Sequence, residues 1–256
     1  MSTLARLSVL IALPAAALLV GGILSGEEAK KPPRVLIVTG ADVPAHDWRT
    51  TTPVTRAILE EGKEFQVVVS EEPAVLETPA LAGYDVVVLN YRNPPDASLS
   101  EAARKNLAEF VAKGKGLVAV HFAVAAWSDW AEYAKMVGRV WVGKREAGDK
   151  ASGHGPRGTF KAKIVAKGSP ITQGLEDFEA DDELYARLAG NAPIDVLVSA
   201  DSDWSSAVEP LVWTLRYGEG RVFVTVLGHD VKARENPAFK KLLSRGCAWA
   251  ASKGGL

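Results

Sequence analysis

Four histidines occur in this chain of 256 residues, and they stand where an α/β protein places its chemistry. Histidine is the side chain most readily used as an acid, a base or a metal ligand near neutral pH. Three of the four follow apolar runs typical of strands, and the fourth lies between glycines: His46, His121, His229 and His154. In an open α/β sheet, ligands bind beyond the carboxyl ends of the strands. We therefore expect the strand-end histidines to meet in one crevice.

A cluster of carboxylates supplies a second set of reactive groups, in the segment Asp181–Tyr185. If this segment is extended, Glu183 and Tyr185 share one face because they are two residues apart. A carboxylate and a phenol on one face can orient a histidine or bind hydroxyl groups. If the segment instead opens a helix, its negative charges would interact favourably with the helix dipole. Asp230 follows His229 directly, although neighbouring residues on a strand point to opposite faces.

These groups predict two kinds of centre. In the first, His121 is the main acid–base catalyst, and His229 and Glu183 orient it or supply a second proton transfer. In the second, Glu183 and three histidines bind a divalent metal, since zinc takes three or four ligands of these types. The histidines of that set are His121, His154 and His229. No short His-Glu-x-x-His motif is present, so the expectation of a divalent metal as cofactor rests on geometry alone.

Aromatic side chains near polar groups are a common means of binding a sugar ring. The segment His46-Asp47-Trp48 has this composition. We expect His46 and Trp48 to contact a carbohydrate, together with His154 and Tyr185. The alternative to an enzyme is a non-catalytic carbohydrate-binding or scaffold module, which the seven tryptophans of the chain would suit.

Covalent catalysis is not expected from this sequence. The chain reads His121-Phe-Ala-Val-Ala125 where α/β hydrolases and glutamine amidotransferases place a nucleophilic Ser or Cys at a sharp turn. The single cysteine, Cys247, falls in a predicted amphipathic helix, where a buried and unreactive thiol is expected. The chain also lacks a dinucleotide-binding glycine pattern and a phosphate-binding loop.

The elements that must position these groups alternate between strand and helix. Short runs rich in Val, Ile and Leu are typical of strands buried in a parallel sheet. They cover Val35–Thr39, Phe65–Ser70, Asp85–Asn90 and Leu117–His121. Helical patterns separate them, one from Thr52-Pro53 to about Glu61 and one over Ala102–Lys113, after a Ser98-Leu-Ser-Glu101 capping box. This alternation predicts an α/β fold with a doubly wound, mostly parallel sheet.

The second half of the chain predicts further strands. Gly218-Glu-Gly220 lies between two apolar runs, which is a signal for a β-hairpin added to the sheet. In order, we expect a helix over Trp127–Val137, strands over Thr159–Ala166 and Ile194–Ser199, hairpin strands over Pro210–Tyr217 and Arg221–Leu227, and a helix from Asn236-Pro237 to about Ala251. The length suits one domain over residues 31–256.

The first thirty residues have the pattern of a targeting segment. Arg6 supplies a positive charge, and an almost unbroken apolar stretch runs from Leu7 to Leu24. This predicts a secretory signal peptide in residues 1–30, or an N-terminal membrane anchor if it is not cleaved. We therefore expect an exported protein, periplasmic or secreted, that meets a membrane only through this segment. With 30 basic and 31 acidic side chains, the chain has no overall field that would attract nucleic acid.

Several of these segments, taken in order, resemble the ThuA-like (trehalose-utilisation) family. They are Val35-Leu-Ile-Val-Thr-Gly40 with His46, Gly114-Lys-Gly-Leu-Val-Ala-Val-His121, Pro170-Ile-Thr-Gln-Gly-Leu175 running to Asp182-Glu-Leu-Tyr185, and Pro210-Leu-Val-Trp213 leading to Gly220-Arg-Val-Phe and Leu227-Gly-His-Asp230. The resemblance covers nearly all of the chain after the leader. One departure is Ser169, which stands before Pro170 where the family is expected to carry a histidine.

This resemblance implies a flavodoxin-like fold related to class I glutamine amidotransferases, without their cysteine. It also implies a role in sugar catabolism, on glycosides oxidised to keto-sugars, with a small carbohydrate as the ligand. A ketone makes the adjacent C–H acidic, so a positioned histidine suffices as catalyst. An enzyme of this kind would be an isomerase, a lyase or a hydrolase. The positions that match the family's polar pattern are His121, His154, Glu183, Tyr185 and His229.

Overall fold

The structure, a computed structural model, describes residues 31–94, 98–127 and 129–252. The signal peptide or anchor expected in residues 1–30 lies outside these residues. From Pro32 onward the chain forms one compact unit. Within the described residues, no helix combines the length and the apolar run that a membrane crossing requires.

One half of the sheet is parallel and is built from the runs of Val, Ile and Leu that the sequence identifies as strands. These strands are β1 (Arg34–Val38), β2 (Gln66–Ser70), β3 (Val86–Leu89), β4 (Gly116–Val120) and β9 (Gly220–Thr225). They lie in the order β2-β1-β3-β4-β9. Every residue of β3, β4 and β9 is buried, as expected for strands covered on both faces.

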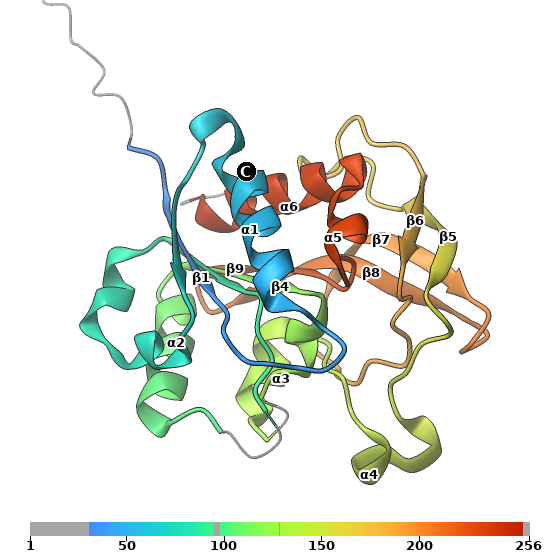
Figure 1. Cartoon of the computed structure of the whole chain (residues 1–256), viewed down its shortest axis with the longest axis horizontal. Helices are drawn as coiled ribbons and strands as arrows, with labels where there is room; N and C mark the ends of the chain where they lie inside the picture. Colours follow the sequence, from blue (N-terminus) through green and yellow to red (C-terminus); the bar gives the residue numbers. More distant parts are fainter. Residues whose placement is uncertain (1–30, 95–97, 128, 253–256) are drawn as a thin grey trace, which may run out of the picture. The chain divides into compact units, whose positions relative to one another are not determined.

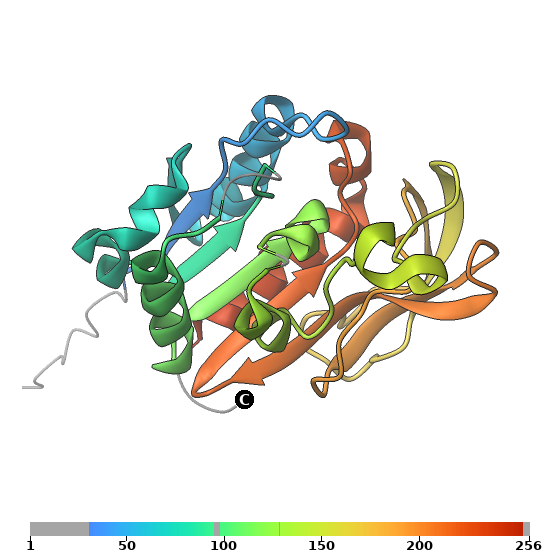
Figure 2. The same ribbon diagram turned by 90° about the horizontal axis from the view of Figure 1, so that it is seen from below.

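The other half is antiparallel and continues outward from β9 (Figure 2). Its strands are β8 (Ala207–Tyr217), β7 (Asp195–Ser202), β5 (Gly158–Ile164) and β6 (Phe178–Asp182). β8 and β9 form the predicted hairpin. β5 is divided between two partners: residues 158–162 pair with β6, and residues 163–164 pair with β7. The β5–β6 pair therefore departs from β7, and β6 packs against α5 (Val231–Arg234).

The sheet is consequently mixed rather than mostly parallel. Among the described residues, four strand pairings are parallel and four are antiparallel. The α/β class is confirmed, but the antiparallel part is larger than the single added hairpin that we predicted. The burial of β5 and β6 partly alternates along each strand, which is typical of antiparallel strands with one solvated face. The finer flavodoxin-like, doubly wound description stays a prediction.

Helices cover both sides of the sheet, with α1 and α6 on one side and α2 and α3 on the other (Figure 1). The remaining α-helices are α1 (Trp48–Glu60), α2 (Glu101–Ala112), α3 (Ala131–Val137), α4 (Lys144–Ala147) and α6 (Pro237–Ala251). Short 3₁₀ segments are η1 (Glu61–Lys63), η2 (Pro73–Glu77), η3 (Pro79–Gly83), η4 (His121–Ala125) and η5 (Gly148–Lys150). α6 begins as predicted, because the Asn236 side chain caps its first turn.

Three other helices begin at residues different from those predicted. Asp47 caps α1 through its carboxylate, so the helix starts at Trp48 and Pro53 lies inside it. The cap of α2 is the hydroxyl of Ser100 rather than that of Ser98. α3 starts only at Ala131, because the φ of 47° at Trp127 is left-handed and cannot continue a right-handed helix.

Candidate functional site

His121 occupies the sharp turn where β4 ends. It is the first residue of η4, and its φ of 50° is a left-handed conformation that few residues other than glycine adopt. The Nδ1–H of His121 donates a hydrogen bond to the carbonyl of Val226 at 2.7 Å. Because a carbonyl can only accept, this bond fixes the tautomer and leaves Nε2 of His121 as an acceptor when the ring is neutral.

The loop after β9 carries His229 and is held from two sides. The buried carboxylate of Asp182, at the end of β6, accepts hydrogen bonds from the backbone N–H groups of Gly228 at 2.6 Å and His229 at 3.2 Å. The fully buried Arg234 donates to the Gly228 carbonyl at 2.9 Å. Gly228 has a φ of 104°, and a Cβ there would lie 2.9 Å from the Phe239 ring. This backbone requires glycine, and it sets where the His229 ring lies.

Glu183 and Tyr185 follow β6 and point to the same place, as their spacing predicts. The chain is irregular there rather than a strand or a helix. The hydroxyl of Tyr185 donates to Nε2 of His121 at 2.9 Å and lies 3.3 Å from Nε2 of His46. Oε2 of Glu183 lies 3.1 Å from Nδ1 of His229 and 3.5 Å from Nε2 of His121. The strand-end histidines therefore meet around a carboxylate and a phenol.

His46 reaches this centre from the loop between β1 and α1. Its ring stacks on Phe122, with centroids 4.6 Å apart and an interplanar angle of 10°. Its centroid is 5.0 Å from those of His121 and His229. Nδ1 of His46 is buried and has no hydrogen-bond partner among the described residues. The ring thus interacts with the other polar groups through Nε2.

Burial and mutual contacts set the charges of the centre. Burial, followed by the fields of His121 and His229, lowers the pKa of His46 to about 3. Burial acts to raise the pKa of Glu183, but the interactions with these same two histidines outweigh it and hold that pKa far below its usual value. The hydrogen bond to Glu183 raises the pKa of His229. Burial raises the pKa of Tyr185. At neutral pH, His46 and Tyr185 are therefore neutral and Glu183 is ionised.

Four ligand atoms of the centre could hold a single metal ion. One atom from each of His46, His121, Glu183 and His229 lies within 4.8 Å of the others. We predicted a set with His154 in place of His46. The structure places His154 at the rim instead, where its side chain is 32% exposed and its Nε2 lies 3.7 Å from Oε1 of Glu183.

The aromatic residue beside the centre is Trp141 rather than the expected Trp48. The Trp141 ring centroid lies 4.7 Å from that of Tyr185 and 6.0 Å from that of His154. Trp48 is buried in the first turn of α1, where its indole N–H donates to Asp42 at 2.8 Å. Within the described residues, no ring contact joins Trp48 to the centre. Sequence reasoning missed Trp141 because it stands in an irregular segment with no spacing that links it to a histidine.

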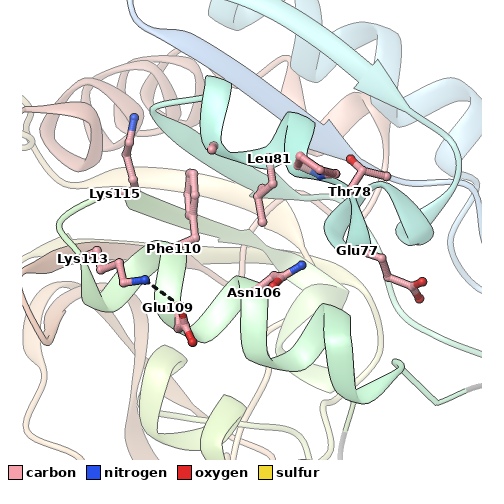
Figure 3. Close-up of a pocket in the computed structure, with 10 residues that line it drawn as sticks. Glu77, Thr78, Leu81, Asn106, Glu109, Phe110, Lys113 and Lys115 are labelled. Atoms are coloured by element: carbon pink, nitrogen blue, oxygen red, sulfur yellow. Dashed lines mark hydrogen bonds and ion pairs between the residues drawn. The ribbon is translucent and has the colours of Figure 1, made fainter.

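A second pocket lies at the opposite edge of the sheet. Its volume is about 420 Å³, and it is lined by α2 and by the segment 77–82 (Figure 3). Lys113 and Glu109 pair across 2.7 Å at its border. Lys115, which also lines it, immediately precedes β4, so the pocket lies at the amino ends of the parallel strands. The histidine centre lies at the carboxyl ends, where ligands of open α/β sheets bind.

Fold and site together define an α/β protein with a histidine–carboxylate centre at the carboxyl edge of a mixed sheet. The chain matches the ThuA family, described as trehalose utilisation, over residues 34–250, and it belongs to this family. This confirms the resemblance drawn from the sequence, and it gives the chain a carbohydrate-related role. No curated protein matches the sequence.

Solved structures show the same fold. A ThuA-like protein from Parabacteroides merdae is 28% identical with a TM-score of 0.76, and the match covers 87% of this chain and 91% of that one. A ThuA-like protein from Bacteroides uniformis is 19% identical with a TM-score of 0.69, covering 88% and 94%. A β-galactosidase from Rahnella is 16% identical with a TM-score of 0.54, covering 82% of this chain and 30% of that one. The last two similarities concern the fold alone.

Proposed function

We propose that this chain is an enzyme of carbohydrate catabolism that acts on an oxidised glycoside by proton transfer at the histidine–glutamate centre. The observation that carries the proposal is the pair of His229 and Glu183, in which the imidazole Nδ1–H donates to the carboxylate at 3.1 Å. Membership of a trehalose-utilisation family supports a carbohydrate as the substrate class.

The pair has the geometry in which a carboxylate orients a catalytic imidazole. With its Nδ1–H donated to the Glu183 carboxylate, the neutral His229 carries a lone pair on Nε2. The His229 side chain is 15% exposed, so it can meet a substrate. His121 was expected to be the main acid–base group, but its side chain is fully buried. In this proposal His121 is a positioning residue, which receives the Tyr185 hydroxyl and packs behind His229.

A ketone on the sugar makes this base sufficient, because it acidifies the neighbouring C–H bond. Nε2 of His229 takes the proton from that carbon, and the C–H electron pair moves toward the ketone oxygen to give an enolate. The Glu183 carboxylate balances the positive charge that forms on the imidazole. The imidazolium then returns the proton in one of two ways. Protonation of the former ketone carbon, with the neighbouring hydroxyl proton passing to the former ketone oxygen, moves the ketone along the ring and isomerises the sugar. Protonation of the glycosidic oxygen, as the enolate electron pair expels it, eliminates the group that this oxygen carries.

The rim of the site offers a surface for the sugar itself. Aromatic rings bind the apolar face of a sugar, while polar side chains bind its hydroxyl groups. Trp141 and His154 form such a surface next to Tyr185.

The test is turnover of glycosides that carry a ketone, compared with the same glycosides in unoxidised form, followed by NMR of the products. We expect turnover of the ketone-bearing set only, and a loss on the order of 100-fold in His229→Gln. Cys247→Ala should retain turnover, because that thiol is buried in α6 and burial raises its pKa. Binding of the oxidised glycoside without turnover would overturn the proposal in favour of a carbohydrate-binding module.

We also propose that residues 1–30 direct export of the chain to the periplasm or the medium. The apolar stretch from Leu7 to Leu24 supports this. Mass spectrometry of the exported protein should find an N-terminus near residues 25–29 if the segment is a cleaved signal peptide. Retention of the whole chain in the cytoplasm would contradict the proposal.

A further inference from the structure

We propose that the same centre is a binding site for a divalent transition-metal cation of the zinc type. Its ligand atoms are Nε2 of His46, Nε2 of His121, Nδ1 of His229 and Oε2 of Glu183. Histidine nitrogen and carboxylate oxygen are ligands that such cations take, and four of them complete a tetrahedral set.

The spacing of the donor atoms supports a tetrahedral site. Zinc–ligand bonds of about 2.0–2.1 Å place neighbouring tetrahedral ligands about 3.3–3.4 Å apart. Nε2 of His121 and Nδ1 of His229 are 3.4 Å apart. Oε2 of Glu183 lies 3.5 Å from the first and 3.1 Å from the second. These three edges match a single cation, and the His46 nitrogen lies within 4.8 Å of all three atoms.

The electronic arrangement also calls for a cation. His121 has its Nδ1 proton committed to the Val226 carbonyl, so its Nε2 lone pair, which accepts from the Tyr185 hydroxyl, is the one that a cation would take in place of that hydrogen bond. Lone pairs of several imidazoles and a carboxylate facing one another repel unless protons or a metal ion lie between them. Among the described residues, the ion pairs of Glu183 are formed with histidines and with no lysine or arginine.

The surroundings hold these ligands in place. The Val226 carbonyl orients His121, and the Asp182 carboxylate fixes the backbone that carries His229. The face of Phe122 supports the ring of His46. Partners of this kind, one layer outside the ligands, set ring orientation and ligand basicity in metal sites. His121 and His46 are also buried, so an ion there would be largely screened from water.

This inference rests on the proposed function only for the location of the catalytic centre. In the proton mechanism, Nδ1 of His229 carries a hydrogen that it donates to Glu183. A bound cation would replace that hydrogen on Nδ1. When bound, it would act as a Lewis acid by taking a sugar oxygen as a fifth ligand beside the four side chains. The proton mechanism and the metal mechanism therefore make opposite predictions for the metal-depleted protein.

The experiment uses the full chain, purified through a tag that contains no histidine and then depleted of metal by dialysis against a chelator. Zn²⁺ is titrated by calorimetry, and Co²⁺ is titrated by its visible absorption bands, whose positions report coordination geometry. We expect one equivalent of either cation per chain. His46→Gln should weaken binding at least about tenfold. The control is Glu109→Gln in α2, which removes a carboxylate at the opposite edge of the sheet, and it should bind either cation as the unaltered chain does.

Circular dichroism and thermal melting of the metal-free variants establish that each is folded. If His46→Gln does not fold, Glu183→Gln takes its place, since it keeps the side-chain shape and removes the ligand charge. Absence of stoichiometric binding, or equal binding by the His46→Gln and Glu109→Gln variants, would overturn the inference. Metal binding without turnover of any oxidised glycoside supports the site and overturns the proposed function. Full turnover by a metal-depleted chain that binds no added cation supports the proposed function and overturns the metal site.

Discussion

The carboxylate of Asp182 accepts a hydrogen bond from the backbone N–H of His229 at 3.2 Å, across 47 residues of sequence. It also accepts one from the N–H of Gly228 at 2.6 Å. The Asp182 side chain is buried, so a lost acceptor there is not replaced by bulk water. A single side chain from β6 thus determines the path of the loop that follows β9.

Replacing this carboxylate should loosen the loop. Asp182→Asn keeps one acceptor oxygen but turns an amide NH₂ toward a backbone N–H donor. We expect a loss of about 1–3 kcal/mol in the free energy of unfolding, measured by urea denaturation. The matched control is Asp181→Asn, in which the neighbouring carboxylate forms ion pairs with the partly exposed Arg157 and the exposed Lys232. It should lose less, because solvent reaches these pairs and screens their interaction. Equal losses would show that Asp182 does not hold the loop.

Gly228 should resist substitution for a reason specific to its backbone. Gly228→Ala places a Cβ 2.9 Å from the Phe239 ring at a φ of 104°, so both sterics and backbone strain oppose it. We expect a loss of about 1–3 kcal/mol in thermal or urea unfolding. Gly168→Ala is the control, since no atom lies within 4 Å of its added Cβ and its φ is not left-handed. Comparable stability of the two variants would contradict this account.

Tyr133 should make the stability of the fold depend on alkaline pH. Its hydroxyl donates to the carbonyl of Ala123 at 2.8 Å in the turn after His121, and burial raises its pKa far above 10. Above pH 10 the unfolded chain loses this proton while the folded chain keeps it. Stability therefore falls as pH rises, by about 1.4 kcal/mol per pH unit.

Urea unfolding at pH 9, 10 and 11 checks this expectation. Tyr133→Phe should be less stable than the unaltered chain at pH 9. At this pH the variant lacks the hydrogen bond to Ala123, and the tyrosine of the unaltered chain is still protonated in the unfolded state. The gap between the two should narrow from pH 10 upward. Parallel pH profiles would show that Tyr133 does not keep its proton in the folded state.

Trp141 should contribute to sugar binding more than to the chemical step. Trp141→Ala removes the ring beside Tyr185 and His154, and we expect the KM for an oxidised glycoside to rise about 2–10-fold with a smaller change in kcat. Trp141→Phe should recover most of this loss. Trp249→Phe in α6 is the control, because that ring lies under Arg221 in a different part of the fold. A fall in kcat alone would exclude a binding role.

The strand-end positions of His121 and His229 could be read from the sequence because their strands have strong local signals. β4 and β9 are fully buried runs, and they lie side by side in parallel, so their carboxyl ends coincide. The shared direction of Glu183 and Tyr185 also followed from spacing alone. The sequence contained no local signal that Glu183 and Tyr185 would reach the two histidines. Their position depends on β6, which pairs with only part of β5, and this division of β5 between two neighbours depends on tertiary packing.

The composition of the ligand set shows the same limit. His154, with a glycine on each side, has the local features of a flexible ligand, but the group of ligand atoms within 4.8 Å of one another includes His46 instead. His46 lies in a loop whose direction is set by α1, and α1 starts earlier than predicted because Asp47 caps it. That single cap changed both the expected helix boundary and the place of Trp48. Local patterns located the elements, whereas contacts remote in sequence selected the residues that meet.

The division of β5 also makes the centre depend on the docking of the two halves of the sheet. His121 and His229 come from the parallel half of the sheet, whereas Glu183 comes from the far end of the antiparallel half. The centre therefore exists only when both halves are folded and docked. A cation or sugar that binds the folded state alone stabilises it by mass action. Such a molecule contacts residues from both halves at once. When it is bound, the two halves should therefore unfold together rather than one after the other.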